Sequence, residues 1–330
     1  MSCKECSTSK FTFNMAKIVE LDDEQVTQSK SKKGGSKVNK NRSKSEEIAG
    51  VSVVQRVVAV VVIITAYIYG RDYLLKRYVV GDEFETFAAV SEYITERSAY
   101  LPCSKDYGSE FKACIPKKCG RFVMDSIVSK MEAKNLRELA EKGMSHGGGN
   151  GGATILDLHS GALSVGEKFV NIYSLTAKSN EPVFSEADFE IYRSVKQKIH
   201  RTIAKKFGID PEMLYLTKPT FFSRMTAKPA VTLHDEYWHP HIDKVTYGSF
   251  FYTSLLYLSD SSKDFSGGRF VFIDKDVNRT IEPRLGRLSF FTSGSENEHF
   301  VEKVEGGTRF AITVSFTCNK KFAISDPAGK

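Results

Sequence analysis

Two histidines and one aspartate are the residues of this sequence whose types and spacing could bind a metal ion. His241 and Asp243 form the one His-x-Asp motif of the chain. Side chains two residues apart on a strand point to the same face of a sheet, so both ligands can converge on one ion. His299 begins a later run of alternating residues and supplies a third ligand. Two histidines and one carboxylate occupy one face of an octahedral Fe(II) ion and leave positions open for oxygen chemistry.

Arg309 follows these ligands on a run whose alternation can be read directly. Arg309 shares one face of this predicted strand with small residues. The other face is apolar: Phe310, Ile312, Val314 and Phe316. A rigid guanidinium fork on the small, polar face suits a carboxylate partner. The alternative is an arginine at the rim of the sheet that pairs with Glu302 or Glu305.

Short runs of alternating residues after residue 228 predict the elements that position these side chains. Turn signals at Gly267-Gly268, Glu282-Pro283 and Gly306-Gly307 separate the runs. We read six of them as strands: 230–238, 251–258, 269–273, 285–291, 299–304 and 308–316. Repeated short strands without helices between them favour a sandwich or a jelly roll.

Two helices are predicted before these strands, at 122–144 and 185–207, from apolar stripes at helical spacing. The second begins at Ser185 with a capping-box pattern and ends at Gly208. Both stripes would cover an exposed face of the sheet. These patterns predict the fold class α+β, a sandwich or jelly roll with supporting N-terminal helices.

Together these residues resemble the 2-oxoglutarate and Fe(II)-dependent oxygenases of the prolyl-hydroxylase type. The resemblance covers roughly residues 215–318 and rests on one set of motifs: His241, Asp243, Tyr257-Leu258, Gly267-Gly268 before Phe270-Val271-Phe272, Gly286 before Leu288-Ser289-Phe290-Phe291, His299 and Arg309. It implies that the fold is a double-stranded β-helix (jelly roll) and that His241, Asp243 and His299 bind Fe(II). It also implies that Arg309 pairs with the far carboxylate of 2-oxoglutarate and that Tyr257 adds a hydrogen bond to this cosubstrate.

The same resemblance implies an oxidoreductase that hydroxylates a protein side chain and releases succinate and CO2, with ascorbate as a further cofactor. Arg309 stands where collagen-type enzymes commonly use lysine, and Trp238 stands where a tyrosine often precedes the metal histidine. Proline, lysine, aspartate and asparagine side chains all remain possible substrates. Two further segments, Cys119-Gly120-Arg121-Phe122 and 155–161, extend the resemblance to one family member over nearly the whole chain. The alternative function is a non-catalytic lumenal binding module on a degenerate dioxygenase fold.

The first 70 residues differ in composition from the rest of the chain. Seven basic residues and no acid lie between Lys30 and Lys44, and the polar segment 1–50 cannot bury enough surface to become ordered. Residues 51–70 are almost entirely apolar and match the length of about 20 residues that a transmembrane helix needs. Because basic residues precede this signal-anchor, the N-terminus is expected in the cytosol.

The remainder of the chain is then expected in the secretory lumen of the endoplasmic reticulum or Golgi. Residues 71–208 are predicted to form a helical stem and supporting region, and residues 209–330 the dioxygenase domain. Four cysteines could form lumenal disulfides in one of three pairings: Cys103, Cys114, Cys119 and Cys318. Asn278-Arg279-Thr280 is a candidate glycosylation site in that compartment.

Composition excludes several other classes of protein. With 330 residues and 41% hydrophobic content, the chain can build a sizeable core and is not wholly disordered. The net charge of +7 is spread along the sequence, so nucleic acid is not the expected partner. The glycine-rich run 147–152 matches no phosphate-binding pattern and is read as a flexible loop. Structural or rim positions are expected for the other histidines: His146, His159, His200, His234 and His239. No pattern indicates an oligomeric state.

Overall fold

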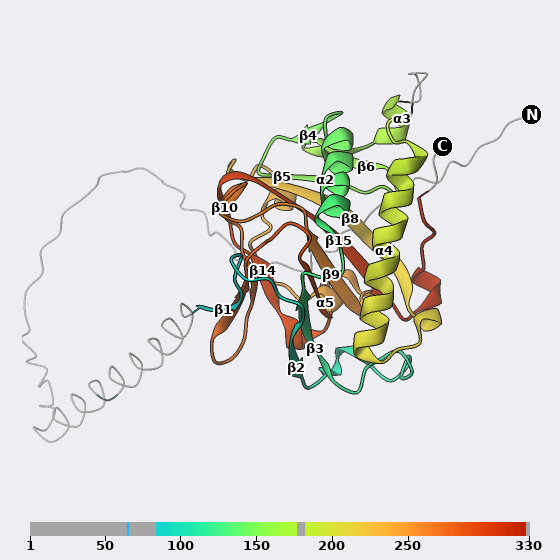
Figure 1. Cartoon of the computed structure of the whole chain (residues 1–330), viewed down its shortest axis with the longest axis vertical. Coiled ribbons are helices and arrows are strands. Elements are labelled where there is room, and N and C mark those ends of the chain that lie inside the picture. Colours follow the sequence, from blue (N-terminus) through green and yellow to red (C-terminus); the bar gives the residue numbers. More distant parts are fainter. Residues whose placement is uncertain (1–64, 66–83, 177–181, 328–330) are drawn as a thin grey trace, which may run out of the picture. The chain divides into compact units, whose positions relative to one another are not determined.

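Two β-sheets and the helices on one side of them position the candidate site (Figure 1). The computed structural model describes Thr65, residues 84–176 and residues 182–327. Apart from Thr65, which is helical, the predicted tail 1–50 and membrane helix 51–70 lie outside the described residues. Among the residues that are described, no helix is both long and apolar enough to cross a membrane.

The smaller sheet has four strands. Their order is β1 (Phe84–Ala88), β12 (Asn278–Ile281), β11 (Phe270–Phe272) and β14 (His299–Val301). The larger sheet runs β2 (Arg97–Leu101), β3 (Cys119–Met124), β13 (Leu288–Thr292), β9 (Tyr252–Tyr257), β15 (Val304–Thr317), β8 (Tyr215–Thr226), β5 (Ala153–Leu156), β6 (Ala162–Gly166) and β4 (Gly148–Gly149). Two further strands pair at its sides, β10 (Phe265–Gly267) with β15 and β7 (Lys168–Asn171) with β6.

The two sheets pack face to face, as in the predicted sandwich or jelly roll. Phe270 and Ile281 of the smaller sheet share one buried apolar cluster with Leu255 and Phe291 of the larger sheet. Most strand pairs are antiparallel, with β1 and β12 a parallel exception. Five of the six predicted strands are present, at β9, β11, β13, β14 and β15.

Helices cover the other face of the larger sheet. In Figure 1, α2 (Lys130–Met144) and α4 (Glu186–Phe207) lie side by side across it. Their apolar stripes join a second buried cluster with the outward residues of β15, which confirms the alternation predicted from the sequence: Phe310, Ile312, Val314 and Phe316. The short helices are α3 (Ile172–Thr176) and α5 (Asp243–Tyr247).

The predicted helix 185–207 is confirmed with both of its ends. The Ser185 hydroxyl accepts the N–H of Asp188, and the Asp188 carboxylate accepts the N–H of Ser185. Gly208 ends the helix in the left-handed conformation, with φ of 66°. Such reciprocal bonds satisfy N–H groups that the first turn of a helix leaves free, so the sequence pattern alone located this start.

The first predicted helix begins later than expected. Residues Cys119–Met124 form β3, which is buried along its whole length between β2 and β13. The helix begins only after Ser129, whose side chain caps α2 together with Glu132. Hydrophobic residues of an inner strand and of a helix stripe are alike in composition, so periodicity extended the helix across the strand.

The predicted strand 230–238 is wrong, because this segment folds into turns around a buried carboxylate. Asp235 lies in a short 3-10 helix, Leu233–Asp235. Its carboxylate accepts the N–H groups of Val231 at 3.1 Å and Thr232 at 2.9 Å. An aspartate that captures nearby backbone donors competes with strand pairing, and here it draws the chain into a turn.

Strands from both halves of the chain share one sheet. In the predicted supporting region, residues 84–171 contribute seven strands in addition to α2. Strand β3 pairs with β13 and β5 pairs with β8, so the larger sheet crosses the predicted 208/209 boundary. Two disulfides also tie this region together, Cys103–Cys119 and Cys114–Cys318.

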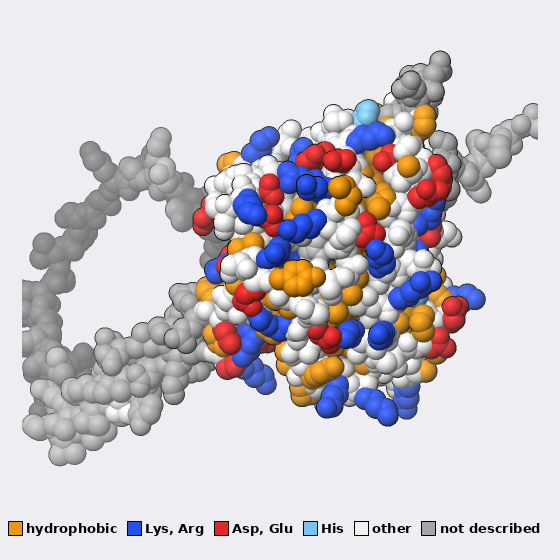
Figure 2. All heavy atoms as spheres, in the orientation of Figure 1, with side chains coloured by type: hydrophobic (Ala, Val, Ile, Leu, Met, Phe, Trp, Pro, Cys, Tyr) orange, Lys and Arg blue, Asp and Glu red, His pale blue; other side chains and the backbone are white. Residues whose placement is uncertain are grey.

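The solvent-facing side of the helix pair carries charges of both signs. Figure 2 shows basic and acidic side chains mixed over this face. Lys198 pairs with Glu132 at 2.6 Å and Lys142 with Asp188 at 3.1 Å, and both pairs link α4 to α2. These partly exposed ion pairs are worth only a few tenths of a kcal/mol each, roughly, so apolar burial beneath the helices holds them in place.

Candidate active site

His241 and His299 are held beside each other by their own main chains. The N–H of His241 donates to the carbonyl of His299 at 2.9 Å, and the N–H of His299 donates to the carbonyl of His241 at 3.1 Å. This isolated bridge joins the segment before α5 to the first residue of β14. The two ring centroids are 4.4 Å apart. Backbone pairing therefore fixes the spacing of two of the predicted metal ligands.

Asp243 is the first residue of α5, which corrects the predicted placement of the His-x-Asp motif on one strand. Its Oδ1 lies 3.6 Å from Nε2 of His241 and 3.8 Å from Nε2 of His299. The three candidate ligand atoms all lie within 4.8 Å of one another. The structure thus brings the three residues together through a backbone bridge and a helix start, and not through a shared strand face.

Two of the three candidate ligands are buried, and the third is partly exposed to solvent. His299 is 4% exposed and Asp243 is 3% exposed, whereas the side chain of His241 is 33% exposed. The opening beside His241 is where a metal ion and a second reactant can enter. Packing holds the buried ligand His299 in place, since the ring of Phe270 stacks on its imidazole with the centroids 4.9 Å apart.

Each candidate ligand has its other polar atom hydrogen-bonded. Nδ1 of His299 lies 2.8 Å from the carbonyl of Asn297, and Nδ1 of His241 lies 3.0 Å from that of His239. The Thr253 hydroxyl donates to Oδ2 of Asp243 at 2.6 Å. These contacts leave Nε2 of each histidine and Oδ1 of Asp243 for an ion, which is how proteins orient metal ligands.

Burial also sets the protonation state of the inner histidine. It lowers the pKa of His299 to about 4, against an opposing effect of the nearby Asp243 carboxylate. A buried imidazolium is disfavoured because its charge loses water. At neutral pH His299 is therefore neutral, as a metal-ligating imidazole must be.

Arg309 lies on β15 and is 1% exposed. Its Nε donates to the carbonyl of Gly268 at 2.9 Å, and its Nη1 contacts the sulfur of Met225 at 3.6 Å. Nη2 is buried and has no hydrogen-bond partner among the described residues. The predicted alternative of a rim ion pair is not observed, because Glu302 pairs with Arg269 at 2.6 Å. A buried guanidinium with a free donor is costly unless a ligand completes it.

Tyr257 stands beside Arg309 on the neighbouring strand β9. Its ring centroid lies 5.5 Å from Cζ of Arg309, and its hydroxyl lies 3.5 Å from Oγ of Ser289. Burial raises the pKa of this phenol, so the hydroxyl keeps its proton and can donate a hydrogen bond. The structure thus places the predicted cosubstrate pair, Arg309 and Tyr257, on adjoining strands.

A glycine makes room for the guanidinium and connects it to the metal ligands. A Cβ on Gly268 would lie 3.0 Å from Cδ of Arg309. Gly268 also accepts the Nε bond of Arg309, and two residues later Phe270 stacks on His299. Arg309 and the candidate ligand His299 therefore both contact the short segment 268–272, which contains β11.

Comparison with known proteins places the chain in a family. Residues 227–317 match the model of the 2OG-Fe(II) oxygenase superfamily. The 2-oxoglutarate and iron-dependent oxygenase domain-containing protein 3 of Xenopus tropicalis is 62% identical over 245 residues, which cover 74% of this chain and 77% of that protein. The chain belongs to the 2OG-Fe(II) oxygenase superfamily. The resemblance predicted from its motifs is confirmed.

Two more distant proteins are also similar to this chain. Human prolyl 3-hydroxylase 1 is 27% identical over 226 residues, which cover 62% of this chain and 29% of that protein. A prolyl hydroxylase from Trichoplax adhaerens, solved with a peptide fragment of the hypoxia inducible factor oxygen degradation domain, has a TM-score of 0.42 and 15% identity, covering 61% of this chain and 84% of that chain.

The superfamily uses Fe(II) and 2-oxoglutarate, and the candidate site of this chain fits both. Two imidazole nitrogens and one carboxylate oxygen are the donor set expected for Fe(II) with open positions. The free Nη2 of Arg309 is the donor that a distal carboxylate would accept from. Sequence reasoning missed Thr253 and Asn297, because nothing in their letters links them to the ligands they support. It named Gly268 as a turn signal and family motif, but not as a contact of Arg309.

The other histidines and Asn278 lie outside the cluster of candidate metal ligands. Nε2 of His159 contacts the hydroxyl of Tyr192 at 2.7 Å, and Nε2 of His200 contacts the carbonyl of Leu214 at 2.7 Å. His239 is exposed and pairs with Glu236, while His146 and His234 are exposed as well. Asn278 opens β12 and is partly exposed, and its glycosylation stays a prediction.

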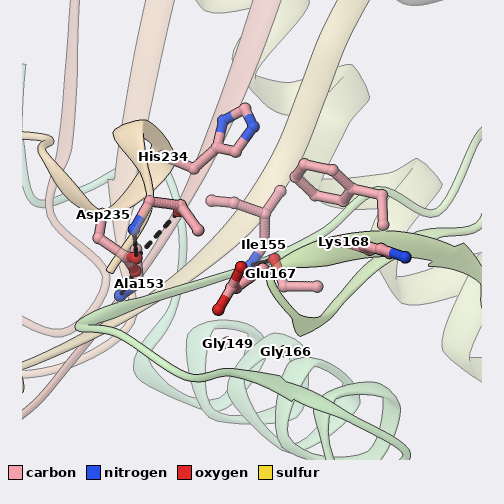
Figure 3. Close-up of a pocket in the computed structure, with 11 residues that line it drawn as sticks. Gly149, Ala153, Ile155, Gly166, Glu167, Lys168, His234 and Asp235 are labelled. Atoms are coloured by element: carbon pink, nitrogen blue, oxygen red, sulfur yellow. Dashed lines mark hydrogen bonds between the residues drawn. The ribbon is translucent and has the colours of Figure 1, made fainter. Parts of the chain in front are cut away.

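A pocket away from the metal ligands lies between the 3-10 turn at Leu233–Asp235 and strands β4 to β7 (Figure 3). It holds about 290 Å³ of space, including its solvent-open mouth, and none of the predicted site residues lines it. Asp235 also accepts the N–H of Ala153 at 2.9 Å. A Cβ on Gly151 would lie 2.2 Å from this carboxylate. Part of the glycine run 147–152 forms β4, and Gly151 is small so that Asp235 can approach.

Proposed function

We propose that this chain is a Fe(II)- and 2-oxoglutarate-dependent dioxygenase that hydroxylates a protein side chain. The observation that carries the proposal is the buried Nη2 of Arg309, which lacks a partner among the described residues. The same guanidinium bonds to Gly268, two residues before Phe270, which stacks on the candidate metal ligand His299. An unpaired, buried guanidinium destabilises a fold, so its presence beside the candidate metal ligands is best explained by a ligand that pairs with it.

The chain supplies ligands, orientation and a dry pocket. His241, Asp243 and His299 would hold Fe(II), with Thr253 and the carbonyls behind each imidazole fixing their direction. Arg309 would bind the far carboxylate of 2-oxoglutarate, and Tyr257 would donate a hydrogen bond to it. When bound, the iron supplies oxygen activation, by which O2 and 2-oxoglutarate convert a C–H group to an alcohol with release of succinate and CO2.

Water exclusion is the second contribution of the fold. Phe270, Phe272 and Phe291 surround the inner face of His299, with ring centroids 4.9, 6.3 and 5.0 Å away. Apolar walls keep solvent from reactive species and strengthen the charge pairing at Arg309. The open side beside His241 is then the approach left for the substrate side chain.

A protein or peptide is the substrate class that we propose. The support is the name of one relative, prolyl 3-hydroxylase 1, at 27% identity. Trp238 precedes His241 by three residues, and Nζ of Lys303 lies 4.0 Å from its ring. Because Trp238 and Arg309 differ from the collagen-type pattern, proline is one of several candidate residue types. Ascorbate is the proposed reductant that keeps the iron ferrous.

Succinate formation tests the proposal. The full chain with Fe(II), ascorbate, 2-oxoglutarate and a library of secretory-pathway proteins is expected to release succinate, and His241→Ala or Asp243→Ala is expected to abolish it. His239→Ala is the matched control, since its side chain is exposed, pairs with Glu236 and lies beside the ring of Trp238, away from the three candidate ligand atoms.

Calorimetry with Mn(II) and 2-oxoglutarate separates this enzyme from the alternative binding module. If the chain is an enzyme, the wild type is expected to bind 2-oxoglutarate in the presence of Mn(II), and the variant Arg309→Ala is expected to lose that binding. A wild-type chain that binds neither metal nor 2-oxoglutarate would contradict the proposal and favour the non-catalytic module.

We further propose that the chain is a single-pass membrane protein with its N-terminus in the cytosol and its oxygenase domain in the secretory lumen. The apolar stretch 51–70 and the basic residues before it motivate the orientation. The disulfides Cys103–Cys119 and Cys114–Cys318 support an oxidising compartment. Glycosidase treatment is expected to shift the mobility of the wild-type chain but not of Asn278→Gln, and insensitivity of both would contradict a glycan at this position.

A further inference from the structure

Arg121, in the motif Cys119-Gly120-Arg121-Phe122, has no role in the site described above, yet it is 1% exposed. Its guanidinium donates in three directions. Nη1 and Nη2 donate to the carboxylate of Asp274 at 2.9 and 2.8 Å, and Nε donates to Oδ1 of Asn297 at 3.0 Å. Nη2 also reaches the carbonyl of Glu296 at 3.4 Å. One planar group thus fixes the chain just before His299.

Asn297 transmits this anchoring to the metal ligand. Its Nδ2 donates to the carbonyl of Thr292 at 2.8 Å and to the hydroxyl of Thr292 at 3.1 Å. With Oδ1 bound to Arg121, both ends of the amide are held. The main-chain carbonyl of the same residue accepts from Nδ1 of His299 at 2.8 Å. The direction of that bond is therefore set from strands β3 and β13.

An aromatic contact provides a second route from Arg121 to the imidazole. Cζ of Arg121 lies 4.0 Å from the ring centroid of Phe272. The Phe272 ring meets His299 edge-on, with centroids 6.3 Å apart. A flat cation stacked on one face of this ring limits how far the ring can move away from the histidine.

We propose that Arg121 is a positioning residue for the metal ligand His299: through Asn297 and Phe272 it holds the imidazole so that Nε2 faces Asp243. This inference rests on the proposed metal role of His299 and not on turnover. Lysine would keep the charge but could not donate in three directions or stack as a plane. Groups that orient a metal ligand typically contribute roughly 10- to 100-fold to metal affinity.

Arg287 provides a matched control for burial and charge. It is 0% exposed and forms a two-point ion pair with Asp125. Its other hydrogen bonds go to main-chain carbonyls: those of Ala88, Ala89, Glu92 and Glu282. These contacts lie away from His299, so replacing Arg287 removes a buried cation without touching the support of a metal ligand.

The experiment compares the chelator-treated full chain as wild type, Arg121→Lys and Arg287→Lys. Mn(II) affinity is measured by calorimetry, the visible spectrum of bound Co(II) reports ligand geometry, and urea unfolding gives the stability of each variant. We expect Arg121→Lys to weaken Mn(II) binding roughly 10- to 100-fold and to alter the Co(II) bands. Arg287→Lys is expected to bind Mn(II) within about twofold of wild type despite a similar loss of stability.

Two results overturn the inference: a wild-type spectrum and affinity in Arg121→Lys, or equal affinity losses in both lysine variants. A wild-type chain that binds neither Mn(II) nor Co(II) overturns both the proposed function and the inference. A wild-type chain that binds metal, without the expected effect of Arg121→Lys, overturns the inference alone. If Arg121→Lys does not fold, Asp274→Asn takes its place, because it keeps Arg121 and removes the charge of its partner. It is expected to change the Co(II) bands in the same way but less, and an unchanged spectrum overturns the positioning role.

Discussion

The guanidinium of Arg309 is the residue-scale feature that most favours binding of a carboxylate at this site. Nη2 of Arg309 is buried, charged and without a partner among the described residues, while Arg121 and Arg287, the other fully buried arginines there, each have a carboxylate. Desolvation accordingly lowers the pKa of Arg309. A carboxylate bound to Arg309 would offset this desolvation cost, so we expect the arginine to favour an anionic ligand.

Gly268 is expected to control how Arg309 sits. In Gly268→Ala the new Cβ would lie 3.0 Å from Cδ of Arg309, and φ of 62° is strained for alanine. We expect 2-oxoglutarate binding to weaken roughly tenfold, about 1.4 kcal/mol, with Mn(II) affinity unchanged. Calorimetry measures both. The control is Gly208→Ala, which has φ of 66° but nothing within 4 Å of the Cβ; equal losses in both variants would mean that backbone strain alone is responsible.

The neutral state of His299 predicts a pH dependence of stability. Its pKa is about 4 in the folded chain, against about 6.5 in the unfolded chain. As the pH falls below about 6.5, the imidazole of residue 299 takes up a proton in the unfolded chain but not in the folded one. The free energy of unfolding therefore decreases until the pH reaches about 4, where the folded chain takes up the proton as well. The loss amounts to about 3 kcal/mol. Urea unfolding of the metal-free chain should show this decline, and His299→Gln should show a smaller one. Parallel curves for the two chains would contradict a depressed pKa.

Two kinds of element hold the site, and they differ in how they are stabilised. Strands β14 and β11 are three residues long and rely on their neighbours for every backbone bond. Helix α4 is 22 residues long, has both ends capped and packs its stripe on β15. The inner face of β15 carries Arg309, so the helix stabilises the sheet from the side opposite the chemistry.

Loss of the α4 cap is expected to lower stability and leave the site intact. Ser185→Ala removes the hydroxyl that accepts the N–H of Asp188, which costs about 1 kcal/mol. Thr202→Ala in the same helix is the control, because alanine favours a helix interior. Urea unfolding of both variants measures the difference, and Mn(II) affinity is expected to match wild type in both. A cap variant that weakened Mn(II) binding would show that α4 acts on the ligands directly.

The chain as a unit is closed by covalent bonds that join distant parts. Cys103–Cys119 ties the end of β2 to the start of β3, and Cys114–Cys318 ties the first part of the domain to the residue after β15. Their sequence separations are 16 and 204 residues. Because loop-closure entropy grows with loop length, the second bond restricts the unfolded chain more.

Removal of the longer link should therefore cost more stability. Cys114→Ser/Cys318→Ser is expected to lose about 5 kcal/mol and Cys103→Ser/Cys119→Ser about 3 kcal/mol. Urea unfolding of the two double variants compares them under the same conditions. The reverse order would indicate that packing around β3 outweighs the entropy of the unfolded chain.

Local patterns predicted much of this arrangement, and long-range contacts supplied the rest. The alternation around Arg309 and the cap at Ser185 are set by nearby residues, and both are confirmed. The three candidate ligands were found from their types, but the bridge between His241 and His299 depends on chain segments far apart in sequence. Asp235 shows the limit most clearly, since the segment predicted as a strand is a turn in which its carboxylate accepts from nearby Val231 and Thr232 and also from distant Ala153.

Cys114–Cys318 also determines what a protease can release. A single cut of the main chain anywhere between these two residues leaves both fragments covalently attached. The fragment with the early strands would then stay joined to the one that ends after β15, and nicked and intact protein would migrate apart only on a reducing gel.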